Sequence, residues 1–228
     1  MAGSLMGFAN AKANGAALSA LNLGDGERVI ELGCGPGHAL QALLRDPHLK
    51  QAIGFDWSPV MLAQAARRNH AALEAGRLKL VRGDFTNLPF DDANADAVLA
   101  VNVVYFMSAF SVAEARRVLR PGGRLVLYAT HGSVMRRWPF AGSHSHRLFD
   151  RKRLATLLAD GGFVRNRIRI DDVDAGFGVS GLLAVATKDG TPARVTQSAA
   201  PRRELRSAPR ADRAAVARSQ AARETPAE

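Results

Sequence analysis

Val29-Ile30-Glu31-Leu32-Gly33-Cys34-Gly35-Pro36-Gly37-His38 is the stretch that decides the fold of this chain. It begins as a mostly apolar strand and runs into a turn with glycines at alternate positions. Such glycines let the backbone turn tightly and approach a ligand that any Cβ would push away. Apolar residues between His38 and Leu44 predict that the turn opens into a helix, whose free N–H groups face the same ligand. The stretch therefore predicts half of a nucleotide site.

Two classes of enzyme use such a strand, loop and helix, and the spacing of the glycines separates them. The dinucleotide fingerprint is G-x-G-x-x-G, whereas Gly33, Gly35 and Gly37 give G-x-G-x-G. The segment from Glu31 to Gly37 resembles the first motif of the class I S-adenosylmethionine (SAM)-dependent methyltransferases. This resemblance implies that SAM is the cofactor and that Glu31 and the three glycines bind it.

Composition narrows the class of protein. A chain of 228 residues can form one sizeable α/β domain. Its net charge of +10 divides into +7 up to Lys188 and +3 beyond, so the excess is spread out and a dedicated nucleic-acid surface is not favoured. A single cysteine forms no internal disulfide and indicates a reducing compartment. Without a membrane-length apolar run or a signal-peptide pattern, we expect a cytoplasmic protein.

Asp56 lies at a second position that nucleotide-binding folds use to contact their ligand. Residues Gln51–Phe55 form a short apolar strand that ends in this carboxylate, 19 positions beyond Gly37. There a carboxylate can accept hydrogen bonds from both ribose hydroxyls of the cofactor. Ser58-Pro59 begins the next helix, as N-cap and first helical residue. Trp57 either covers the adenine or packs beside the turn, and the sequence leaves both open.

The third strand, Leu78–Val81, is followed by Gly83-Asp84-Phe85. These residues are similar to the methyltransferase pattern in which an acidic residue binds the adenine amino group and the next residue meets the ring. The resemblance implies these roles for Asp84 and Phe85. The alternative is that Asp84 bonds to its own turn, as aspartates often do.

The fourth strand, Asp96–Val101, is a near-continuous apolar run, as expected when both faces of a sheet are covered. Its end leads to Asn102 and Tyr105, where the family holds the methyl group against its acceptor. We expect Asn102 to bind the cofactor and Tyr105 to line the reaction chamber or take part in catalysis. The pair is similar to the Asn-Pro-Pro-Tyr motif of enzymes that methylate DNA or RNA bases, but both prolines are missing, which weakens that interpretation.

Residues 130–150 are irregular and follow a strand, which is where open α/β sheets bind ligands. We expect the methyl acceptor here, with His131 as a candidate general base. His144 and His146 lack companions at metal-ligand spacing, so no metal is expected. Three arginines either hold an acidic substrate or form a solvated face: Arg136, Arg137 and Arg147.

The remaining pattern completes the predicted fold. A helix over 112–119 faces Ala113, Ala115, Val118 and Leu119 inward and Arg116, Arg117 and Arg120 outward, and Pro121-Gly122-Gly123 breaks it before a strand at 124–129. A helix over 150–160 precedes two apolar strands, 163–170 and 179–187, whose short connection predicts an antiparallel hairpin. The fold class is α/β: a Rossmann-like three-layer sandwich with a seven-stranded, mostly parallel sheet ending in that hairpin.

Three regions follow from this assignment. Residues 1–23 form an N-terminal leader of one or two short helices, from which Asn10 or Asn14 either reaches the cofactor or faces solvent. Residues 24–188 form the SAM-binding methyltransferase domain. Residues 189–228 have no aromatic and few large aliphatic side chains, so they form a basic tail that is predicted to be disordered.

The predicted activity is transfer of a methyl group from SAM to a small-molecule acceptor. The reaction depends on in-line approach of the nucleophile to the methyl group, so a dedicated base is not required. Net charge and the arginine-rich tail leave an RNA or protein methyltransferase as the alternative. Two further alternatives are an NAD-dependent oxidoreductase and a protein that binds SAM without turnover.

Overall fold

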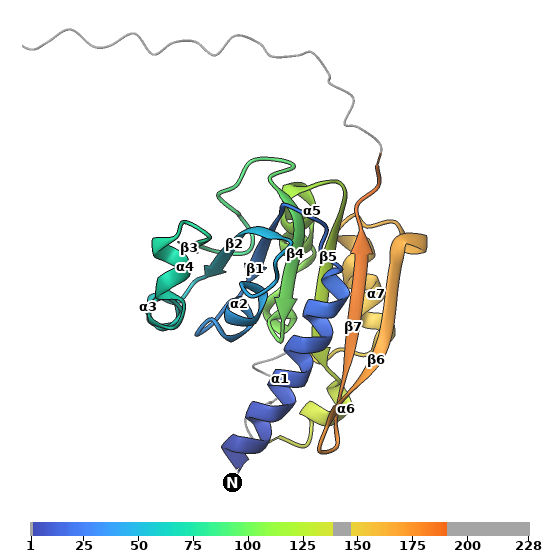
Figure 1. Cartoon of the computed structure of the whole chain (residues 1–228). Coiled ribbons are helices and arrows are strands. Elements are labelled where there is room, and N and C mark those ends of the chain that lie inside the picture. The colour runs from blue at the N-terminus through green and yellow to red at the C-terminus, as the bar shows by residue number, and fades with distance from the viewer. Residues whose placement is uncertain (1, 139–146, 191–228) are drawn as a thin grey trace, which may run out of the picture. The chain divides into compact units, whose positions relative to one another are not determined.

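The computed structural model describes residues 2–138 and 147–190, which form one sheet covered by helices on both faces. The strand order is β3-β2-β1-β4-β5-β7-β6 (Figure 1). The strands are β1 Glu27–Leu32, β2 Leu49–Asp56, β3 Leu78–Arg82, β4 Ala95–Val101, β5 Leu119–Thr130, β6 Ile168–Gly176 and β7 Val179–Thr187. β1 to β5 pair in parallel, whereas β7 runs antiparallel to both β5 and β6. The predicted seven-stranded sheet with a closing hairpin is confirmed.

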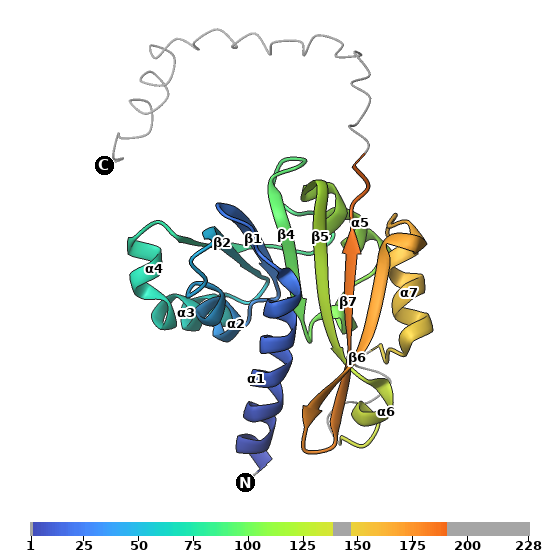
Figure 2. The same ribbon diagram turned by 45° about the vertical axis from the view of Figure 1, so that its right-hand side comes forward.

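Helices complete the other two layers. They are α1 Ala2–Leu21, α2 His38–Leu43, α3 Pro59–Arg68, α4 His70–Glu74, α5 Ala109–Val118, α6 Gly132–Met135 and α7 Arg151–Asp160, with 3-10 turns at Val104–Phe106 and Arg165–Arg167. α1 to α4 contribute to the core on one face of the sheet, and α5 and α7 to the core on the other. Figure 2 shows α1 in front of the sheet and α7 behind it.

β4 lies at the centre of the sheet and shows why a near-continuous apolar run of sequence forms a buried strand. Its successive side chains alternate between the two cores, with Ala97 and Leu99 in the one that contains α1 and Val98 and Ala100 in the other. All four are fully buried. Period-two alternation of strand side chains requires apolar residues at every position when both faces are covered.

Of the one or two helices expected in the leader, the structure has one, α1, although Gly7 and Gly15 interrupt its pattern, because Ala13, Ala17 and Leu21 bury against the sheet. The boundaries predicted for the first strand of the hairpin were wrong. β6 begins at Ile168 and extends to Gly176, so the strand includes the polar segment 171–174, which was predicted as a connection. This edge strand pairs with β7 alone, and its polar residues face solvent without cost.

The helix after β4 also differs from expectation. α5 begins at Ala109, where Ser108 and Ser111 form a reciprocal capping box, and Ala113 is exposed although it was predicted to face inward. Pro121-Gly122-Gly123 lies within β5, between Leu119, which pairs with Ala95, and the continuous pairing that starts at Arg124. Within the described residues, we find no helix that combines the length and the apolar character needed to cross a membrane.

Candidate active site

Two cavities lie beyond the carboxyl ends of the parallel strands. The β2–β3 cavity, of about 640 Å³, is lined by residues that follow β2 and β3, among them Asp56, Trp57, Asp84 and Phe85. The α1 cavity, of about 500 Å³, is lined by the glycine loop, Glu31 and one side of α1. Both cavities are lined by Gly33, Val101 and Asn102. They therefore meet at the tips of β1 and β4, where ligands bind in open α/β sheets.

The three glycines of the loop all have positive φ values: 66° at Gly33, 51° at Gly35 and 80° at Gly37. A Cβ at Gly33 would lie 2.4 Å from Cγ2 of Val103, and one at Gly37 would lie 2.6 Å from Nδ2 of Asn69. A Cβ at Gly35 would meet nothing within 4 Å. Gly33 and Gly37 thus permit close packing, whereas Gly35 presents bare backbone to open space, as a site for a ligand requires.

Asp56 ends β2 as predicted and is 5% exposed. One carboxylate oxygen accepts a hydrogen bond from the backbone N–H of Gly35 at 2.9 Å, and the other accepts one from Ser58 N–H at 2.9 Å. The carboxylate therefore fixes the glycine loop and the start of α3 while it lines the β2–β3 cavity. Its predicted bonds to a ribose stay a prediction.

Glu31 is the most unusual titratable group of the site. It is 3% exposed, and its Oε2 atom is buried with no hydrogen-bond partner within the described structure. Burial, with a further contribution from Asp56, raises the pKa of Glu31 to about 8. An unpaired buried carboxyl is costly unless a ligand pairs with it, and Glu31 lines the α1 cavity. The residue fits a cationic or hydrogen-donating group.

The predicted adenine-side residues come together around the β2–β3 cavity. Trp57 is 72% exposed, and Phe85 packs against Phe55 with ring centroids 6.1 Å apart. Oδ1 of Asp84 accepts hydrogen bonds from Thr86 N–H at 2.7 Å and Thr86 Oγ1 at 2.6 Å, which lowers the pKa of Asp84. Asp84 thus makes the turn bonds that formed the alternative interpretation, and it also lines the cavity.

Asn102 lies where the two cavities meet and has a positive φ of 54°. Its Oδ1 accepts hydrogen bonds from the Tyr105 hydroxyl at 2.9 Å and the Thr130 hydroxyl at 3.1 Å. Its Nδ2 donates to Oδ1 of Asn10 on α1 at 3.3 Å, so the leader helix reaches the site. Sequence reasoning missed Thr130, whose partner lies 28 positions away and leaves no local pattern.

Tyr105 and His131 were predicted to be catalytic, and both roles stay predictions. Tyr105 is 6% exposed, its hydroxyl accepts a hydrogen bond from Thr130 N–H at 2.7 Å, and burial raises its pKa to about 12. His131 caps α6, contacts Oγ of Ser133 through Nδ1 at 3.1 Å and lines a separate small cavity. Tyr105 therefore stands behind Asn102, and His131 lies apart from the two larger cavities.

No group of three His, Cys, Asp or Glu side chains suited to a metal ion occurs in the described part of the chain. His144 and His146 lie outside the described residues. Arg136, Arg137 and Arg147 are exposed.

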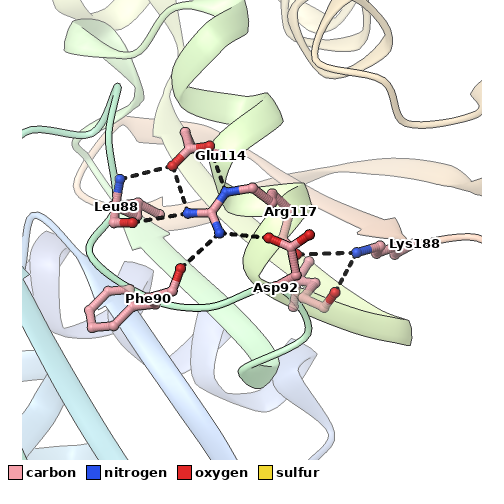
Figure 3. Close-up of polar contacts among 7 residues, drawn as sticks. Leu88, Phe90, Asp92, Glu114, Arg117 and Lys188 are labelled. Carbon is pink, nitrogen blue, oxygen red and sulfur yellow. Dashed lines mark hydrogen bonds and ion pairs between the residues drawn. The ribbon is translucent and has the colours of Figure 1, made fainter. Parts of the chain in front are cut away.

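Figure 3 shows how α5 holds the loop between β3 and β4. The guanidinium of Arg117 donates to the carbonyl oxygens of Leu88 at 2.9 Å and Phe90 at 2.8 Å, and to the carboxylates of Asp92 and Glu114, both at 2.8 Å. Glu114 in turn accepts a hydrogen bond from Leu88 N–H at 2.9 Å. Arg117 was predicted to face solvent; it is instead half-buried because the loop folds over it.

The held loop begins with the residues that line the β2–β3 cavity. Asp84 and Phe85 lie at its start, and the ring of Phe90 packs edge-on against Phe55, which also contacts Phe85. Arg117 is therefore connected to the cavity through the loop backbone and through this aromatic cluster.

Comparison with known proteins bears on this arrangement. Residues 30–127 match the model of a family described as a methyltransferase domain, and this span contains the glycine loop, Asp56, Asp84 and Asn102. Residues 30–127 therefore carry a methyltransferase domain, as the resemblance to the class I SAM-dependent methyltransferases implied. The predicted resemblance is confirmed.

Similar proteins of known name match this chain in part. It is 39% identical over 103 residues to phthiotriol/phenolphthiotriol dimycocerosates methyltransferase 1 of Mycobacterium ulcerans, which covers 44% of this chain and 36% of that protein. It is 39% identical over 101 residues to a fatty-acid O-methyltransferase of Mycolicibacterium smegmatis, covering 43% of this chain and 35% of that protein. The chain thus spans about a third of the length of these relatives.

A solved structure extends the likeness over the fold. The [4+2]-cyclase SpnF superimposes with a TM-score of 0.64 at 21% identity, over 77% of this chain and 80% of that chain. At this identity the match concerns the fold alone.

Proposed function

We propose that this chain transfers the methyl group of SAM to a small-molecule acceptor. The observation that carries the proposal is the pair of cavities that meet at Gly33 and Asn102, with one buried carboxyl group on each side. SAM is a nucleoside joined to an amino acid at a sulfonium. A molecule of that kind needs two adjoining compartments with the reactive centre between them, which is the arrangement at the tips of β1 and β4.

The residues present fit the cofactor. Glu31 has an unpaired buried oxygen and would bind the ammonium group of its amino-acid portion. Asp56 accepts two backbone hydrogen bonds, and a carboxylate has about four acceptor positions, so it retains capacity for ribose hydroxyls. Trp57 and Phe85 would contact the adenine, and Gly35 would allow close approach of the backbone.

Bound SAM would supply an electrophilic methyl group, and the protein supplies orientation and shielding from water. Asn102 is held by Tyr105, Thr130 and Asn10, so its position at the meeting point is fixed before any ligand binds. A rigid polar side chain at that place would orient the acceptor. His131 as a base and Tyr105 as a catalytic group are further proposals that this arrangement does not require.

The relatives support a small acceptor, since their names specify a lipid and a fatty acid. Because this chain matches about a third of their length, the names of the relatives do not identify its own acceptor. The competing proposal, an RNA or protein methyltransferase, is supported by the net charge of +10. We also propose a cytoplasmic location, which is supported by the single cysteine.

A second candidate function is binding of SAM without methyl transfer. The observation in its favour is that SpnF, which shares the fold, is a [4+2]-cyclase. Incubation of the full chain with methyl-labelled SAM and a panel of small carboxylic acids, phenols, amines and lipids separates the two. We expect label in an acceptor and none in a Gly35→Ala control. Label in RNA or protein alone would favour the competing acceptors, and binding without any transfer would favour the second candidate.

A further inference from the structure

A third cavity, of about 510 Å³, lies between α6 and α7 and shares no lining residue with the two described above. Three arginines from different segments line it: Arg136 after α6, Arg147 before α7, and Arg153 within α7. We call it the arginine cavity. Arg136 and Arg153 also line the small adjoining cavity of His131.

Among the described residues, no ion pair neutralises the charges of these three arginines. Within residues 2–138 and 147–190, every ion pair of an arginine involves some other arginine, such as Arg116 with Asp189 or Arg151 with Asp172. Nη1 of Arg147 donates to the carbonyl oxygen of Met107 at 3.0 Å, and Nη1 of Arg153 donates to that of Leu148 at 3.2 Å. Backbone oxygens thus orient two guanidinium groups and leave their other N–H donors available.

Two carboxylates lie near the cluster and do not balance it. Asp160 lines the arginine cavity. Asp150 lines the adjoining cavity, but it is the N-cap of α7, and its Oδ1 accepts a hydrogen bond from Arg153 N–H at 2.8 Å. The nearby Arg153 also helps to hold the pKa of Asp150 below its ordinary value. Three arginines and one carboxylate residue therefore line the arginine cavity.

The rest of the wall consists of Thr156 and three apolar residues. Phe149 and Leu157 are buried, and Leu148 packs against the same core. Guanidinium groups beside apolar side chains match a ligand with an anionic oxygen group at one end and a hydrocarbon portion at the other. The volume is within the range of small-molecule sites.

We propose that the arginine cavity binds a small amphiphile whose polar end is a carboxylate or a phosphate. The planar guanidinium groups of Arg147 and Arg153 hold the anionic oxygens, and Phe149 and Leu157 contact the hydrocarbon portion. The site is distinct from that of the cofactor and does not depend on methyl transfer.

Calorimetry of the full chain with octanoate, octyl phosphate and octanol tests the proposal. Saturable binding of either anion, with octanol at least about tenfold weaker, is the expected result, because a charge-assisted hydrogen bond contributes about this much. The anion that binds more tightly identifies the source of the oxygen group. Added salt should weaken binding of the anions, since all three arginines are exposed.

Substitutions assign the binding to this cavity. Arg147→Gln and Arg153→Gln should each weaken the anion about tenfold, whereas Arg153→Lys should retain more affinity. The matched control is Arg151→Gln on the same helix, whose guanidinium pairs with Asp172 at 2.5 Å, and it should leave affinity unchanged. Equal binding of octanol, equal affinity in all variants, displacement by S-adenosylhomocysteine, or no binding of either anion would overturn the proposal.

Discussion

At the scale of one residue, Glu31 shows how the site is suited to a charged ligand. The carboxyl is buried beside Asp56, and its pKa is raised to about 8, so the folded protein without ligand retains a proton that the unfolded chain loses near pH 4.5. Stability should therefore fall as the pH rises between these two values. In Glu31→Gln that fall should be absent, which thermal unfolding across the pH range would measure.

The same residue predicts how cofactor binding depends on pH. An ammonium group of the ligand prefers the ionised carboxylate, so binding should release a proton at neutral pH. We expect affinity for S-adenosylhomocysteine to rise from pH 6 to about pH 8 in the native chain, up to about tenfold per pH unit. Glu31→Gln should bind more weakly and show a flat profile. A rising profile in that variant would assign the effect to another group.

Gly35 and Gly33 give a matched pair of substitutions. Both have positive φ, but only at Gly33 would a Cβ collide with a buried side chain, that of Val103. Gly35→Ala should keep the fold at a cost of about 1–2 kcal/mol and lose most affinity for S-adenosylhomocysteine, because its Cβ would occupy the ligand's approach. Gly33→Ala should destabilise the fold itself. Calorimetry and thermal unfolding measure the two effects, and unchanged affinity in Gly35→Ala would contradict the assignment.

At the scale of elements, Arg117 connects α5 with the loop that follows β3. Arg117→Gln removes the donors to Leu88 and Phe90 and leaves two loop carbonyls without that partner. We expect affinity for S-adenosylhomocysteine to fall several-fold, since the loop carries Asp84 and Phe85 into the cavity. The neighbouring Arg116→Gln loses its pair with Asp189 and should leave affinity unchanged.

A comparison of the two variants separates positioning from general stability. If both lose thermal stability by similar amounts but only Arg117→Gln loses affinity, the loop is the cause. Equal affinity in both variants would restrict Arg117 to a structural role.

Local patterns predicted the elements that depend on neighbouring residues. A few adjacent residues are enough to indicate each of three features: the glycine loop, Asp56 at the end of β2 and the closing hairpin. Arg117 was placed wrongly because its burial depends on a loop about 27 positions away. The limits of β6 were missed for a similar reason, since pairing with β7 extends a strand over polar residues that no apolar pattern marks.

At the scale of the molecule, all described cavity residues belong to the part of the chain that precedes Pro192. A chain ending at Gly190 keeps Asp189, the partner of Arg116. It should therefore bind S-adenosylhomocysteine with unchanged affinity and transfer methyl groups to a small acceptor. Loss of activity together with loss of RNA binding would instead favour the nucleic-acid alternative.

The central claim is that a nucleoside with an amino-acid arm binds where the two cavities meet at Gly33 and Asn102. Calorimetry of the full chain with S-adenosylhomocysteine, and with NAD for comparison, tests it most directly. We predict a saturable heat of binding at one site for S-adenosylhomocysteine, lost in Gly35→Ala, and none for NAD. Absence of heat with S-adenosylhomocysteine and with SAM, or equal binding of NAD, would contradict the account.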